Sequence, residues 1–74
     1  MSFESLGRIL IVVPTYDEAD NIAEVVERLR AAVPEADVLI VDDNSPDGTG
    51  RIADSLAREL DAVEVLHRAR KEGL

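Results

Sequence analysis

The sequence contains no cysteine, few basic residues and no long apolar run. Without cysteine, neither a disulfide nor a thiolate metal site can form. Sixteen acidic residues against eight basic ones give a net charge of −8, so we expect no binding to nucleic-acid backbones or to anionic lipid surfaces. The longest apolar run, Ile9–Val13, is far shorter than the roughly 20 residues of a membrane-spanning helix. We therefore expect no transmembrane span.

The N-terminal residues also lack the features of a signal peptide. Residues 1–7 carry Glu4 and no basic residue, and no small-residue cleavage site follows the apolar run. We therefore expect a cytoplasmic location. A chain of 74 residues allows one small domain, which buries only roughly 60% of the surface of its unfolded chain.

Hydrophobic patterning predicts an alternation of strands and helices. Short aliphatic runs indicate strands buried on both faces, as in a parallel sheet. Apolar residues at helical spacing indicate two amphipathic helices between them. The resulting βαβαβ order is one half of a doubly wound, Rossmann-like α/β fold with right-handed crossovers. Strands are expected at residues 9–13, 38–41 and 63–66, and helices at residues 22–33 and 52–60.

This topology predicts an uncovered sheet face. If the strands add in one direction, both crossover helices lie on the same side of the sheet. The opposite side of two strongly apolar strands then has no cover within the chain. We therefore expect self-association, or packing against further polypeptide.

The loop after the first strand contains no glycine. A dinucleotide-binding fold needs glycines there so that its backbone can approach a pyrophosphate, and we therefore expect no NAD site. Instead, Tyr16 offers a ring to pack on a base or ribose, and Glu18 offers acceptors to hydroxyl or N–H groups. Alternatively, Tyr16 packs within the loop and Glu18 favours the start of the first helix, which Asp17 or Asp20 can cap.

The loop after the second strand begins with Asp42 and Asp43. Carboxylates at this edge can accept hydrogen bonds from a nucleobase or ribose, or together hold Mg²⁺. The alternative is turn formation and helix capping. For Asp47 we expect capping, since Asp47 or Thr49 precedes the second helix closely.

A third polar segment follows the last strand. Arg68, Arg70 and Lys71 lie close to Gly73, and cations beside a flexible glycine can meet a diphosphate. A solvated surface loop is the alternative. His67 is expected to be structural or to cover the sheet edge. The coincidence of three polar segments at one sheet edge favours a ligand site there.

The motifs resemble those of family-2 glycosyltransferases. The stretch 13–18 with Asn21 and Ile22 looks like the family's opening motif, in which the position of Asp17 is often Asn. The stretch 41–49 is more specific, and its Ser-Pro-Asp-Gly-Thr portion, residues 45–49, resembles the polyprenol-phosphate (dolichyl-phosphate) mannosyltransferase branch. The basic and glycine residues after the last strand resemble that branch's Arg-x-x-Lys-x-Gly-Leu-Gly segment. The resemblance extends from about Arg8 to Leu74.

The resemblance implies an inverting transfer of mannose, or another hexose, from a nucleotide sugar such as GDP-mannose to a polyprenyl or dolichyl phosphate. It also implies a GT-A type fold, of which residues 1–74 are an incomplete N-terminal nucleotide-binding portion, at the cytoplasmic face of a membrane. Lys71 is expected near the diphosphate. The residues expected to line or adjoin the nucleotide pocket are Pro14, Tyr16, Glu18, Val41, Asp42 and Asp43.

No catalytic residue is expected within this chain. The family's Asp-x-Asp motif, which holds Mg²⁺ or Mn²⁺ under the diphosphate, is expected further along the polypeptide. Since the metal stabilises the leaving group, we expect the chain alone to be inactive and to hold no metal firmly. Two alternatives remain open: a receiver-like signalling module using Asp42 and Asp43, and an inactive structural βαβαβ unit.

Overall fold

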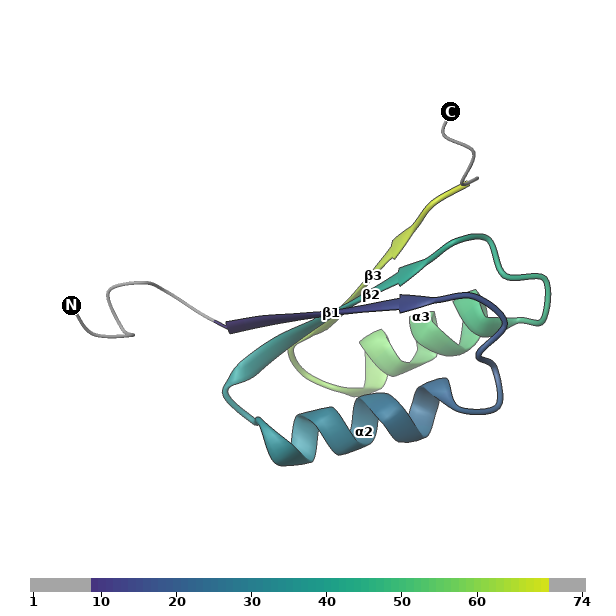
Figure 1. Ribbon diagram of the computed structural model, residues 1–74. Coiled ribbons are helices and arrows are strands. Elements are labelled where there is room, and N and C mark those ends of the chain that lie inside the picture. The colour runs from purple at the N-terminus through teal and green to yellow at the C-terminus, as the bar shows by residue number, and fades with distance from the viewer. Residues whose placement is uncertain (1–8, 70–74) are drawn as a thin grey trace.

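A computed structural model describes residues 9–69, which form a three-stranded parallel sheet and two helices (Figure 1). The strands lie side by side in their order along the chain. The α/β class and the predicted βαβαβ order are both confirmed. The elements are β1 (Ile9–Thr15), α2 (Ile22–Ala32), β2 (Ala36–Asp42), α3 (Thr49–Glu59) and β3 (Val63–His67).

The strand register places the carboxyl ends of all three strands at one edge. Thr15 pairs with Asp42, and Asp42 pairs with His67. The loops that follow β1 and β2, and the chain that follows β3, therefore leave the sheet at the same edge. This is the edge at which open parallel sheets bind ligands.

Strand β1 continues past the proline at which we expected it to end. Pro14 pairs with Val41, and Thr15 pairs with Asp42. Proline lacks a backbone donor, which excludes it from central strands but not from an edge strand. Because β1 lies at the edge of the three-stranded sheet, Pro14 fits within it.

The hydrophobic core lies between the sheet and the two helices, which cover the same face of the sheet (Figure 1). Alternate residues of β2 point into this core, and Ile40 at its centre is fully buried. Burial of such a side chain contributes roughly 1.5–3 kcal/mol. The buried members of the core are Ile22, Val26, Val38, Ile40, Ala53, Leu56 and Val63.

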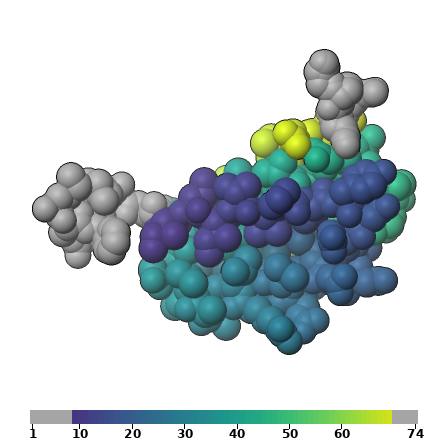
Figure 2. Space-filling model, in the orientation of Figure 1, coloured from purple at the N-terminus to yellow at the C-terminus, as the bar shows by residue number. Residues whose placement is uncertain are grey.

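The opposite sheet face carries apolar side chains without cover within residues 9–69. Leu10 and Val12 of β1 are 56% and 53% exposed, and Leu66 of β3 is 49% exposed. Figure 2 shows β1 lying along the surface above α2. The expectation of strands buried on both faces is therefore wrong for β1, because both helices pack on one side. The predicted bare face is confirmed.

Both helices begin at residues other than the predicted caps. The N-cap of α2 is Asn21, so neither Asp17 nor Asp20 occupies that position. The N-cap of α3 is Gly48 with φ of 91°, a left-handed conformation that glycine adopts without a Cβ penalty. Asp47 Oδ1 nevertheless accepts a hydrogen bond from the backbone N–H of Thr49, at a distance of 3.0 Å. None of the helices within residues 9–69 is both long and apolar enough to span a membrane.

Candidate functional site

Of the residues predicted to bind a nucleotide, those within residues 9–69 lie at the ends of β1 and β2 or on the loops that follow these strands, at the carboxyl edge of the sheet. The loops meet where the N–H of Asp43 donates to the carbonyl of Thr15, over 3.2 Å. Tyr16 is 53% exposed beyond β1, and Val41 is half-buried on β2. The two strands thus bring aromatic, aliphatic and acidic side chains to one edge.

Three successive backbone groups of the first loop are bonded to side chains of the second. The N–H groups of residues 17–19 donate, in chain order, to Ser45 Oγ, Thr49 Oγ1 and Asp47 Oδ2. Each donor–acceptor distance is 3.0 Å. Asp17 and Asn44 adopt left-handed backbone conformations, with φ of 59° and 58°. Aspartate and asparagine are among the few non-glycine residues that tolerate this region. The two loops therefore form one hydrogen-bonded unit.

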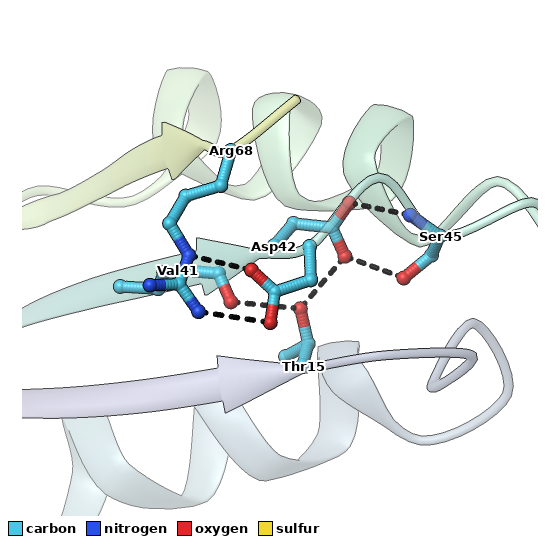
Figure 3. A network of polar contacts seen from close by, with 6 residues as sticks. Thr15, Val41, Asp42, Ser45 and Arg68 are labelled. Carbon is cyan, nitrogen blue, oxygen red and sulfur yellow. Dashed lines mark hydrogen bonds and ion pairs between the residues drawn. The ribbon is translucent and has the colours of Figure 1, made fainter. Parts of the chain in front are cut away.

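Asp42 is buried beneath these loops and is only 2% exposed. Its Oδ1 accepts the hydroxyls of Thr15 at 2.8 Å and Ser45 at 2.7 Å, and its Oδ2 accepts the Ser45 N–H at 3.1 Å (Figure 3). Burial alone raises the pKa of Asp42, but the hydrogen bonds from Ser45 and Thr15, with a smaller pull from His67, outweigh it. The pKa of Asp42 therefore lies below its ordinary value, and the carboxylate joins β1, β2 and the second loop.

Asp43 forms a bidentate ion pair with Arg68. The Nε of Arg68 donates to Oδ1 at 2.5 Å, and its Nη2 donates to Oδ2 at 3.0 Å (Figure 3). The backbone N–H of Arg68 also donates to the carbonyl of Asp42, over 2.8 Å. Hydrogen bonding and charge attraction from Asp43 raise the pKa of Arg68. Arg68, expected at a diphosphate, is thus engaged at the Asp43 carboxylate, whereas Lys71 and Arg70 lie outside the described residues.

His67 connects the end of β3 to α3. Its Nε2 lies 2.8 Å from Asp54 Oδ1. Gly50 packs so closely that a Cβ there would lie 3.2 Å from both Asp42 Oδ2 and the His67 ring. The lack of a side chain at Gly50 thus lets α3 approach the ends of β2 and β3. These contacts agree with the structural role expected for His67.

Three of the predicted residues, Pro14, Glu18 and Asp42, each line one of two surface hollows. One of about 230 Å³ lies beside β1, and Pro14 and Glu18 line it. The other, of about 360 Å³, is lined partly by Asp42, His67 and Arg68. These predicted residues therefore line two separate concave surfaces rather than one enclosed pocket.

The geometry can be compared with known proteins. Residues 10–74 match the family model described as glycosyl transferase family 2. The chain belongs to this family. Its three parallel strands and two helices agree with the N-terminal βαβαβ arrangement of a GT-A glycosyltransferase domain. The match includes the first βα unit, which the receiver-module alternative leaves as an addition, so that alternative is abandoned.

Three curated relatives of the chain are named as two mannosyltransferases and one monophosphomannose synthase. The chain is 55% identical over 67 residues to undecaprenyl-phosphate mannosyltransferase of Micrococcus luteus, and 48% identical over 68 residues to polyprenol monophosphomannose synthase of Mycolicibacterium smegmatis. It is 32% identical over 69 residues to dolichol-phosphate mannosyltransferase of Pyrococcus furiosus. Each alignment covers 90% of this chain but only 28%, 26% and 19% of the respective relative. No solved structure matches the chain significantly.

The residues that the structure describes do not form a binding site for the divalent metal expected in the whole enzyme. The adjacent carboxylates of Asp42 and Asp43 bind different partners, one inside the loop network and the other at Arg68. Within residues 9–69, no group of three histidine or acidic side chains is placed to hold a metal ion. A metal site elsewhere in the polypeptide stays a prediction.

Acid is expected to destabilise this family-2 chain as the pH falls below about 4. The pKa of Asp42 is lower in the folded chain than the value of about 3.9 in an unfolded one. The unfolded chain therefore binds more protons between these two values, and stability present above pH 4 is lost on acidification through the folded-state pKa. Melting temperatures from pH 7 to pH 2 test this, because Asp42→Asn should show a flatter dependence. Equal slopes for the two chains would contradict the assignment.

Proposed function

We propose that this chain forms the nucleotide-binding part of a glycosyltransferase that transfers mannose from GDP-mannose to a polyprenyl phosphate. The observation that carries the proposal is the convergence of Tyr16, Glu18 and Asp43 at the carboxyl edge of a family-2 sheet. The names of the relatives support mannose and a polyprenyl phosphate acceptor. Because a polyprenyl phosphate acceptor resides in a membrane, we also propose that the enzyme acts at a membrane surface, on its cytoplasmic face.

The ion pair at Asp43 supports a guanine base. Both Asp43 oxygens accept from two neighbouring N–H donors of Arg68, and a ligand edge with two parallel N–H donors can take the same place on the carboxylate. The edge of guanine carries a carbonyl followed by two N–H donors, which suits a guanidinium beside a carboxylate. Uracil alternates carbonyl, N–H and carbonyl, so its second carbonyl would face an Asp43 oxygen. This complementarity favours GDP over UDP.

The first loop supplies the remaining contacts in this proposal. The exposed ring of Tyr16 provides a surface on which a base or ribose can pack. Glu18 lines the hollow beside β1, where its carboxylate can accept ribose hydroxyls. Pro14 and Val41 pair across β1 and β2 and provide apolar surface beside the sugar. These residues bind and orient the donor, and we expect the chain alone to bind GDP without transferring mannose.

Replacing Asp43 with alanine is expected to weaken GDP binding by about 1–3 kcal/mol, or roughly 5- to 150-fold, because two ligand donors lose their acceptor. The affinity of Asp43→Asn for GDP should lie between those of the wild type and Asp43→Ala, since asparagine keeps one acceptor oxygen. Calorimetry with GDP, run in parallel with UDP, measures the effect. The control is Asp61→Ala, which removes an exposed carboxylate after α3, near the opposite end of the sheet.

Two results would count against the proposal. Equal affinity for GDP and UDP would remove the support for a guanine base. No binding by the wild-type chain at millimolar GDP would favour the alternative of an inactive structural unit.

A further inference from the structure

The second loop holds the first by an unusual set of contacts. Residues 17–19 precede α2, so their backbone N–H groups have no partner within a helix. All three donate instead to side-chain oxygens of residues 45–49, which lie 28–31 positions further along the chain. A single five-residue segment thus provides every acceptor for three consecutive donors. These contacts are called the loop clamp below.

Each acceptor of the loop clamp is itself held in place. The Ser45 hydroxyl donates to buried Asp42, which fixes the direction of its lone pairs. The Thr49 side chain is fully buried, and its hydroxyl donates to Asp47 Oδ1. The oxygen of Thr49 therefore remains available to accept the N–H of Glu18, over 3.0 Å. The directions of these hydrogen bonds are consistent with one another throughout the clamp.

We infer that Ser45, Asp47 and Thr49 are positioning residues for the donor nucleotide, acting through the backbone of residues 17–19. The inference rests on the proposed function, which places Tyr16 and Glu18 against the nucleotide. Both side chains belong to the loop that the clamp holds. Pre-organisation of a binding loop increases affinity because less conformational entropy is lost on binding.

The two oxygens of Asp47 distinguish a positioning role from simple helix capping. Its Oδ1 accepts the Thr49 N–H at the start of α3, whereas its Oδ2 accepts the Ala19 N–H across the loops. A cap acts on the stability of α3 alone. A clamp also controls the Ala19 amide and the affinity of the folded chain for its ligand.

The test uses Asp47→Ala in the 74-residue chain, with Asp20→Ala as control. Asp20 is an exposed acid in the first loop, beside Ala19, so its loss matches the change in charge. Amide exchange of Ala19 is followed by NMR, and GDP affinity is measured by titration of the folded chain. Loss of one hydrogen bond should accelerate Ala19 exchange about two- to tenfold and raise the Kd for GDP by a similar factor. Asp20→Ala should change neither.

A milder variant keeps the test decisive if Asp47→Ala fails to fold. Asp47→Asn retains one acceptor oxygen where the carboxylate accepts from three donors, and it should shift Ala19 exchange and the Kd by smaller amounts in the same directions. Unchanged Ala19 exchange would overturn the clamp, and an unchanged Kd with faster exchange would overturn its role in positioning. If the wild-type chain bound no GDP, the proposed function and the positioning role would both fail, and Ala19 exchange would still decide the clamp.

Discussion

The Asp42→Ala chain is expected to lose most of its cooperative structure at 25 °C. Asp42 accepts three hydrogen bonds from Thr15 and Ser45 at a site that is 2% exposed. Each buried donor left without a partner costs about 1–3 kcal/mol. The whole stability of a domain is roughly 0.05–0.15 kcal/mol per residue. Because the chain is small, loss of two or three partners removes a large share of that stability.

Chemical denaturation monitored by circular dichroism measures this loss. The control Asp61→Ala removes an exposed carboxylate and should change the free energy of unfolding by less than about 0.5 kcal/mol. Asp42→Asn keeps the shape and one acceptor, so it should fall between the wild type and Asp42→Ala. A wild-type-like transition for Asp42→Ala would show that water or a rearranged loop satisfies Thr15 and Ser45 equally well.

The element order could be predicted because it depends on local patterns. Aliphatic runs and helical spacing both concern neighbours within about ten residues. Strand ends were less predictable, and β1 continues through Pro14 because its outer edge makes no ladder bond within residues 9–69. The burial of β1 could not be predicted from its composition alone, since an apolar strand can have the same sequence pattern whether one or both of its faces are covered.

The site was predicted as a location but not as a set of contacts. Paired acids at the end of a strand indicated an edge site, yet their spacing could not show that Asp42 is buried while Asp43 meets Arg68. One available signal was the charge of Arg68, which directly follows a strand expected to lie beside β2. The loop clamp could not be predicted, because Asp47 has the same turn-forming composition whether it caps α3 or also bonds Ala19.

We expect the chain to self-associate through the sheet face that the helices leave uncovered. Leu10, Val12 and Leu66 expose about half of their surface on this side, and burial contributes roughly 25 cal/mol per Å² of apolar area. The outer side of β1 can also pair with another strand. The net charge of −8 opposes association, and salt screens such repulsion. Sedimentation equilibrium should therefore show association that strengthens with both protein and salt concentration.

Val12→Lys should convert the associated chain to a monomer, because it places a charge on the uncovered face. Ala31→Lys is the matched control, since Ala31 is exposed on α2 and the same charge is added on the helical side. Ala31→Lys also reduces the negative charge, so it should associate at least as well as the wild type if the sheet face is the interface. Equal loss of association in both variants would exclude that face. A wild-type chain that stays monomeric at millimolar concentration, with a sharp melting transition, would show that three half-exposed apolar residues are too few to overcome the charge repulsion.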